Sequence, residues 1–145
     1  MSDLIHVEHG AAPWQASHDA RVIKQYRYYD VPLSGVIEQN GCQYLFKCAS
    51  RPDEVLTLWW YTDITPDERR MIEDGPAEEF NTRFRKLDLH GWCRIAFATE
   101  RLGIVDYEDA ELTPEGLAEA LGKLQDRLDE LGRDAHGLTV DLVLT

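Results

Sequence analysis

The dipeptide Asn40-Gly41 lies between two extended apolar runs, and it constrains the fold of this chain more than any other feature. A two-residue Asn-Gly loop in that setting is typical of a β-hairpin, because both central residues of a type I′ turn need a positive φ angle. The turn also sets the register, and we expect the facing pairs 39–42, 37–44, 35–46 and 33–48. The sequence therefore predicts an antiparallel hairpin with strands at residues 33–39 and 42–48.

Further strands are predicted where β-branched and aromatic residues cluster or alternate with polar ones. The segment 92–99 fits a helical pattern in part, but Cys93, Ile95 and Phe97 alternate with other residues, so we favour a strand there. The last residues, from Leu138 onward, alternate cleanly between apolar and polar side chains, which is typical of a half-buried strand. The remaining predicted strands cover residues 21–30, 55–62 and 103–107.

Three helices are predicted, and each begins at a proline. Thr65 and Glu68 on either side of Pro66 form a capping box, which indicates a helix at about 66–74. Pro76 opens a second helix at about 76–87, and Pro114 opens a longer one at about 114–131. Leucines repeat along the longest helix at a 4-3-4-3 spacing, over about two heptads. Because that repeat is short for a coiled coil, we expect the helix to lie on a sheet.

The pattern as a whole predicts a single α+β domain over residues 1–145. Its core is a mostly antiparallel sheet of five to seven strands, with the long helix packed on one face. A chain of 145 residues is long enough to bury a substantial core. Histidines, glycine and proline interrupt any apolar period in residues 1–20, so we expect a loosely structured N-terminal arm there.

The charge of the chain disfavours some classes of partner, since 27 acidic and 15 basic residues give a net charge of −12. Nucleic acids and anionic membrane surfaces are bound mainly through lysine and arginine, so we predict neither as a partner. The sequence has no apolar run of the roughly 20 residues that a membrane span needs, and its N-terminus has no secretory-signal pattern. Three unevenly spaced cysteines do not indicate a disulfide framework, so we expect a cytoplasmic protein.

The sequence has none of the common signatures for phosphate, dinucleotide, zinc-protease or serine-hydrolase sites. His6, Glu8 and His9 are residue types that zinc accepts, and a helix would bring the two histidines together. Nothing indicates a helix there. His90 and Cys93 have a spacing that suits a nucleophile and its base, but no further partner can be placed. We predict no metal, no cofactor and no catalytic residue.

Aromatic residues supply the candidate binding site. Trp59 and Trp60 are adjacent in a predicted strand, so their side chains point to opposite faces of the sheet. Both can be buried only if the sheet is covered on both sides, and the leucine-rich helix covers one side. Either the chain itself packs on the other face, or a partner, a ligand or a second copy in a homodimer covers it. The candidate binding residues are Tyr26, Arg27, Tyr28, Tyr29, Trp59, Trp60 and Tyr61.

Acidic residues gather between residues 106 and 119, where no lysine or arginine occurs. The spacing lacks the order and the glycine of an EF-hand, so we do not predict a calcium site. One interpretation is a solvated acidic face, and the other is a surface that docks a basic partner. The residues of this predicted docking surface are Asp106, Glu108, Asp109 and Glu111.

Three functional hypotheses follow from these patterns. The first is a small acidic, non-enzymatic binding or regulatory protein, of the inhibitor, immunity or adaptor kind, that docks a basic protein. The second is a small-molecule binding protein or enzyme whose aromatic pocket is lined by Tyr26, Tyr28, Trp59 and Tyr61. The third is a structural subunit of a homo-oligomer. The first is favoured because the charge is one-sided and no catalytic constellation is recognisable.

Overall fold

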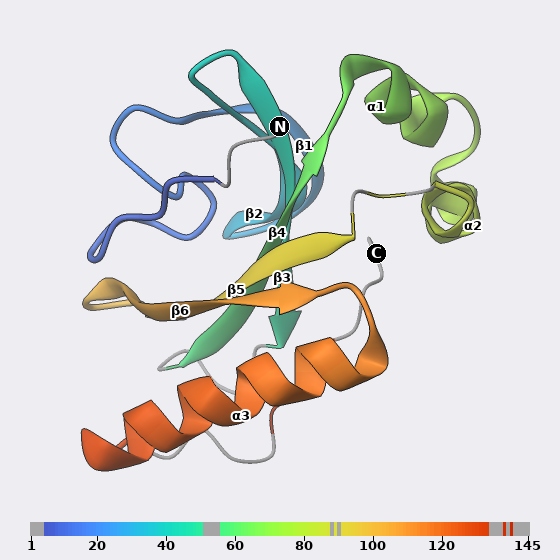
Figure 1. The fold of residues 1–145 in the computed structure, drawn as a ribbon. Helices are drawn as coiled ribbons and strands as arrows, with labels where there is room; N and C mark the ends of the chain where they lie inside the picture. The colour runs from blue at the N-terminus through green and yellow to red at the C-terminus, as the bar shows by residue number, and fades with distance from the viewer. Residues whose placement is uncertain are drawn as a thin grey trace.

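The computed structural model describes residues 5–50, 56–87, 89, 91–133, 138 and 140. Within these ranges the chain forms a six-stranded antiparallel sheet whose strands lie in sequence order (Figure 1). The strands are β1 (Arg21–Tyr29), β2 (Val31–Gln39), β3 (Cys42–Ser50), β4 (Thr57–Ile64), β5 (Trp92–Thr99) and β6 (Gly103–Glu111). The helices are α1 (Pro66–Glu73), α2 (Phe80–Arg85) and α3 (Pro114–Glu130), with a short 3₁₀ helix, η1 (Ala77–Glu79), before α2. The predicted α+β fold is confirmed, and so is the strand at 92–99.

The hairpin at Asn40-Gly41 joins β2 to β3 as predicted. The φ angles of Asn40 and Gly41 are 52° and 80°, as a type I′ turn requires. The expected pairs 39–42, 37–44 and 35–46 all occur, and the aligned ladder runs as far as Ser34 opposite Lys47. A local turn therefore sets the register of the central strands, and through it the face on which each side chain lies.

Helix α1 begins at the capping box that the sequence predicts. The Thr65 hydroxyl accepts a hydrogen bond from the Glu68 amide at 3.1 Å, and the Glu68 carboxylate accepts one from the Thr65 amide at 2.9 Å. The predicted helix at 76–87 is shorter and divided into η1 and α2, and neither part has a side-chain hydrogen bond at its N-cap. No helix in the described ranges is both long and apolar enough to cross a membrane.

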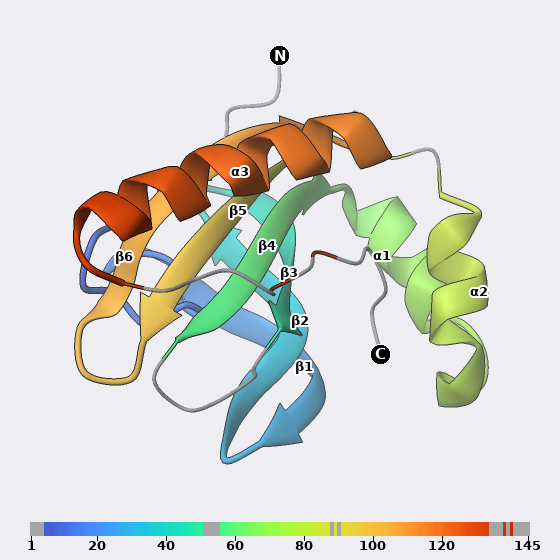
Figure 2. The ribbon, with the colours of Figure 1, turned by 90° about the horizontal axis from the view of Figure 1, so that it is seen from below.

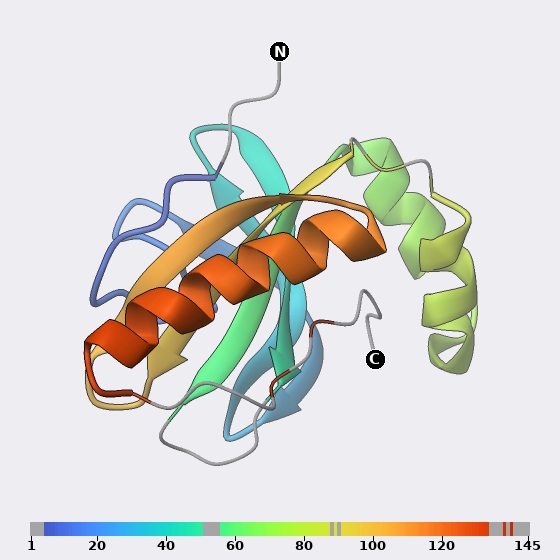
Figure 3. The same ribbon diagram turned by 60° about the horizontal axis from the view of Figure 1, so that its bottom comes forward.

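One face of the sheet packs against the helices, as Figures 2 and 3 show for α3. Leu124 and Leu128 of α3 are fully buried on it, which confirms that the leucine-rich helix lies on the sheet. Trp60 of β4 points to this face and stacks on Phe84 of α2, with ring centroids 5.9 Å apart. Leu138 is also buried here, whereas most of the predicted C-terminal strand lies outside the described residues.

The opposite face is covered by residues 5–20 of the same chain, drawn in blue on the far side of the sheet from α3 in Figure 1. This segment forms turns with no helix or strand, yet its Ile5, Val7 and Ala16 side chains are buried against the sheet. Trp59 and Tyr61 of β4 lie under it. Both faces of the sheet are therefore covered by the chain itself, without a partner or a second copy.

Buried polar side chains hold residues 5–20 in place. The Gln39 side-chain amide accepts a hydrogen bond from the His6 backbone amide at 2.7 Å and donates to the His6 carbonyl at 2.8 Å. The same amide donates to the Ser17 hydroxyl at 2.7 Å. The Tyr61 hydroxyl donates to the Pro13 carbonyl at 2.8 Å. Side chains of the sheet thus form hydrogen bonds with some of the segment's backbone N–H and C=O groups. A buried segment without regular secondary structure requires such partners.

Strand β6 adds a second attachment through its backbone. The Ile104 carbonyl accepts from the Gly10 amide, and the Ile104 amide donates to the Ala11 carbonyl, each at 2.9 Å. Gly103 makes this approach feasible, because a Cβ at that position would lie 2.4 Å from the Gly10 carbonyl oxygen. Its φ angle of 67° is also one that residues other than glycine rarely adopt.

We expect the substitution Tyr61→Phe to lower the free energy of unfolding by about 1–3 kcal/mol, because it leaves the buried Pro13 carbonyl without its donor. Urea denaturation followed by circular dichroism measures this change. The matched control is Tyr28→Phe, since the Tyr28 hydroxyl donates to a backbone carbonyl at an exposed site. We expect that control to change stability by less than about 0.5 kcal/mol. Equal effects of the two changes would contradict the buried attachment.

Candidate functional site

The aromatic residues that the sequence singles out do not form one site. Trp60 lies in the core under the helices, whereas Trp59 and Tyr61 lie in the core under residues 5–20. The exposed fractions of Trp59, Trp60 and Tyr61 are 2%, 0% and 0%. Burial raises the pKa of the Tyr61 hydroxyl well above its ordinary value. These three side chains support the interior, and the sheet presents no open aromatic face within the described residues.

The predicted residues on β1 lie apart from those on β4. Tyr26 is half-buried, and its hydroxyl donates to the Glu73 carboxylate of α1 at 2.6 Å. Burial, and next the hydrogen bond to Glu73, raise the pKa of Tyr26. Arg27, Tyr28 and Tyr29 are exposed near the end of the strand. Tyr28 and Tyr29 therefore remain available to a partner, whereas Tyr26 attaches the edge strand to a helix.

Most of the predicted acidic docking surface is paired with arginines of the same chain. Arg127 of α3 donates to Asp106 at 2.7 Å and to Glu108 at 2.8 Å. The hydrogen bond to Asp106 is the largest cause of the raised pKa of Arg127. Arg94 of β5 donates to Asp109 at 2.6 Å. Glu111 is exposed at the end of β6. The arginines come from other elements, so the local sequence did not reveal the pairing.

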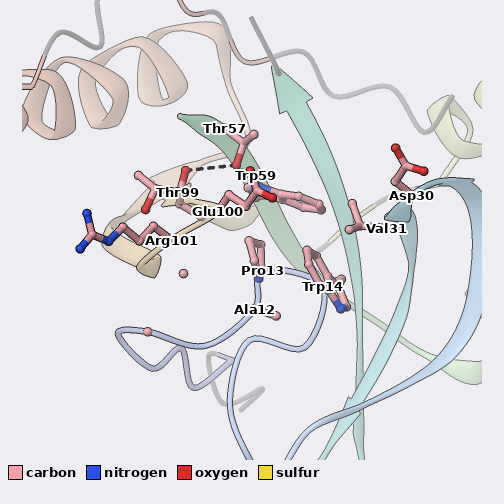
Figure 4. Close-up of a pocket in the computed structure, with 13 residues that line it drawn as sticks. Ala12, Pro13, Trp14, Asp30, Val31, Thr57, Trp59, Thr99, Glu100 and Arg101 are labelled. Carbon is pink, nitrogen blue, oxygen red and sulfur yellow. Dashed lines mark hydrogen bonds between the residues drawn. The ribbon is translucent and has the colours of Figure 1, made fainter. Parts of the chain in front are cut away.

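A cavity of about 340 Å³ opens between the N-terminal segment and one end of the sheet (Figure 4). The walls come from residues 10–14, the β1–β2 turn, the start of β4 and the β5–β6 turn. The volume falls within the range of about 300–1,000 Å³ that is typical of small-molecule pockets. The thirteen lining residues are Gly10, Ala12, Pro13, Trp14, Asp30, Val31, Thr57, Trp59, Ala98, Thr99, Glu100, Arg101 and Gly103.

Two indole rings dominate the cavity wall. The ring centroids of Trp14 and Trp59 are 6.1 Å apart, and the rings are inclined at 52°. The Trp59 indole nitrogen donates to the Thr57 hydroxyl at 2.7 Å, and that hydroxyl donates to the Ala98 carbonyl at 3.2 Å. The polar atom of Trp59 is therefore already satisfied by the protein. Trp59 is 2% exposed whereas Trp14 is half-buried, so contact with a ligand would fall mainly on the Trp14 ring.

The charged residues at the cavity are Asp30, Glu100 and Arg101. In Figure 4 the Glu100 side chain extends toward Trp59, whereas the Arg101 guanidinium points away from the cavity. None of the three side chains has an ion-pair partner among the residues that the structure describes. The cavity lining therefore includes two acids and one base, but only the Glu100 carboxylate is directed inward, since Asp30 and Arg101 point outward in Figure 4.

The lining combines aromatic rings with carboxylates and threonine hydroxyls, and it contains no histidine, cysteine, lysine or tyrosine. The electron-rich faces of tryptophan rings attract cations, and a carboxylate beside them adds to that attraction. The arrangement therefore suits an organic cation with an apolar body.

Only one member of the pocket predicted from the sequence, Trp59, lies in the cavity lining. Tyr26, Tyr28 and Tyr61 lie elsewhere, and the second indole comes from Trp14 in the segment expected to be a loose arm. The signal for Trp14 was its size, because a tryptophan is buried at least in part in most folded chains. Residues 1–20 have no apolar periodicity, so the sequence did not show which element Trp14 packs against.

The cysteines give no catalytic site within the described residues. Cys93 is buried in the core under the helices, and burial raises the pKa of its thiol to about 12. His90, its suggested partner, lies outside the described residues. Cys42 is exposed, and Cys48 is half-buried. The thiol with the spacing of a nucleophile is thus the one whose environment most opposes a thiolate.

Comparison with known proteins gives no relative from which a function could be transferred. No protein-family model, no curated protein and no solved structure matches this chain. The site is therefore interpreted from its own chemistry.

We expect Cys93 to react with a thiol reagent at neutral pH about a thousandfold more slowly than Cys42. The reason is that a pKa raised from 9.0 to about 12 lowers the thiolate fraction by three factors of ten. Ellman's reagent measures both rates in two variants that retain one cysteine each, C42S/C48S and C93S/C48S. Similar rates for both thiols would contradict the burial.

The free energy of unfolding should also fall as the pH rises above about 9, because the Cys93 thiol loses its proton at a lower pH in the unfolded chain than in the folded core.

Proposed function

We propose that this protein binds an organic cation, with an ammonium or guanidinium group, in the cavity that Trp14 and Trp59 line. The observation that carries the proposal is the pair of indole rings 6.1 Å apart beside Glu100, whose charge no described residue neutralises. This function is that of the second hypothesis from the sequence, a small-molecule binding protein. Trp59 is the one residue that the predicted pocket and the observed cavity share. An ammonium group over a tryptophan face contributes about 0.5–2 kcal/mol, depending on how far it is desolvated.

The charge of the whole protein supports a cationic ligand. A net charge of −12 attracts cations toward the surface and repels anions before they reach the cavity. In Figure 4 the Asp30 carboxylate is directed away from the two indole rings, whereas the Glu100 side chain extends toward Trp59, so Glu100 is the acid that a cation in the cavity would meet. Phosphorylated or carboxylated ligands would be repelled by Glu100, with Arg101 directed outward.

The cation has two sources that share this chemistry. It is either a free small molecule or the side chain of a lysine or arginine on a basic protein, which is the partner expected from the sequence. The acidic residues of β6 give that partner less support than their number suggests, since Arg127 and Arg94 already bind three of them. The homo-oligomer hypothesis stays a prediction that no observation in the fold favours.

Titration with chosen probes tests the proposal and separates the two sources. Choline and agmatine serve as free cations, the uncharged carbon isostere of choline as the neutral control, and a short lysine- and arginine-rich peptide as the protein-derived source. Isothermal calorimetry measures each affinity. Binding of the free cations but not of the neutral isostere supports a small-molecule ligand. Binding of the peptide alone supports a basic protein partner, and binding of none of the cations contradicts the proposal.

We expect Trp14→Leu to weaken cation binding by about 5- to 30-fold, because it keeps an apolar side chain but removes about 1–2 kcal/mol of cation–π attraction. Glu100→Gln should weaken it as well. The matched control for the charge is Glu111→Gln, which removes one exposed acid from the far end of β6. An equal loss from the two glutamate variants would show that only the overall charge attracts the ligand, and would contradict a role for Glu100 in the cavity.

A further inference from the structure

Three side chains with metal-ligating atoms meet at the base of the N-terminal segment, and a fourth, His6, lies beside one of them. His6 and Glu8 come from its beginning, and His18 and Asp19 from its end. The His18 Nδ1 atom is 2.5 Å from a Glu8 carboxylate oxygen, and the His6 Nε2 atom is 3.6 Å from the same oxygen. One ligand atom each from Glu8, His18 and Asp19 can be chosen so that all three lie within 4.8 Å of one another.

We propose that Glu8, His18 and Asp19, with His6 as the fourth ligand, form a zinc site. Tetrahedral zinc with bonds of about 2.0–2.1 Å to nitrogen and oxygen places its ligand atoms about 3.3 Å apart. The His18–Glu8 and His6–Glu8 separations of 2.5 and 3.6 Å bracket that value, so small rotations of these side chains at the surface bring the atoms to it. Two imidazoles with two carboxylates suit zinc, whereas magnesium and calcium prefer oxygen ligands alone.

A buried hydrogen-bond chain orients the Asp19 carboxylate from behind. The Gln39 amide donates to the Ser17 hydroxyl at 2.7 Å, and the Ser17 hydroxyl donates to the Asp19 carboxylate. Ser17 has no exposed surface, and Gln39 is only 4% exposed. Such outer partners fix the direction of a ligand in known metal sites, and losing one typically lowers metal affinity by 10- to 100-fold. A carboxylate held from the core in this way differs from a chance cluster of mobile surface charges.

The imidazoles remain accessible to an incoming ion. The side chains of His6 and His18 are 64% and 82% exposed, so a hydrated cation reaches them without unfolding the segment. His9 belongs to a different environment, because its ring packs 5.7 Å from the ring of Tyr107. The pair that the sequence suggested, His6 with His9, is therefore replaced by His6 with His18, which the chain brings back beside Glu8.

Zinc at this position would close the loop that forms one wall of the cavity. The Glu8 amide donates to the Ala16 carbonyl at 2.8 Å, so the two ends of the loop already approach each other. Pro13 and Trp14 lie between those ends. A metal that joins Glu8 to His18 would add a link across ten residues and would stabilise the segment that covers the sheet. The site does not depend on what the cavity binds.

The test is calorimetric titration of the tag-free 145-residue chain with zinc chloride at neutral pH, after treatment with a chelator. We expect one zinc ion per chain and a higher melting temperature when zinc is bound. His18→Ala and Asp19→Ala should each lower the zinc affinity by more than 100-fold, and Ser17→Ala by about 10- to 100-fold. His9→Ala is the matched control from the same segment and should leave the affinity unchanged.

Several results would overturn the assignment. One is the absence of one-to-one binding by the wild-type protein, and another is an unchanged affinity in His18→Ala. Displacement of zinc by an equal concentration of calcium would also contradict an imidazole-containing site. Because His18 and Asp19 are exposed, the His18→Ala and Asp19→Ala variants without zinc should have the circular dichroism spectrum and melting temperature of the zinc-free wild type. That comparison separates loss of the metal site from loss of the fold.

Discussion

The cover that residues 5–20 form over the sheet is the interaction on which the rest of this structure depends. Strand β4 carries large aromatic side chains on both faces, with Trp60 under the helices and Trp59 and Tyr61 under the N-terminal segment. Each such side chain buries about 150–250 Å², and at about 25 cal/mol per Å² an uncovered face would forfeit several kcal/mol. The segment has no ladder of its own, so Gln39, Tyr61 and Ile104 supply its hydrogen bonds.

Because the segment is fixed, two candidate sites can form on it. The cavity lies beside its middle, where Pro13 and Trp14 face Trp59, and the histidine–carboxylate cluster lies where its ends meet. Gln39 supports the cluster, since it holds the backbone of His6 and the hydroxyl that orients Asp19. The packing that covers the second face of the sheet therefore also places Trp14 at the cavity and the ends of the segment beside each other.

The surplus of acidic residues is distributed unevenly over the fold. Along β6, Arg127 and Arg94 satisfy three carboxylates, and these pairs join the strand to α3 and to β5. Around the cavity, Asp30 and Glu100 have no such partners within the described residues, so the field there is less compensated. Charge counted along the chain pointed to β6, whereas the ion pairs in the fold leave Asp30 and Glu100 among the carboxylates without such a partner in the described residues.

Local sequence accounts for the elements whose causes are local: the Asn40-Gly41 turn with its register, the Thr65 cap, the leucine stripe of α3 and the alternation that made 92–99 a strand. Each depends on residues within about ten positions of one another. The packing of the whole chain brings residues 5–20 over the second face, Trp14 to Trp59 and His18 to Glu8. Those contacts come from apolar burial and hydrogen bonds in a segment without periodicity, so no repeating pattern in the sequence predicts them.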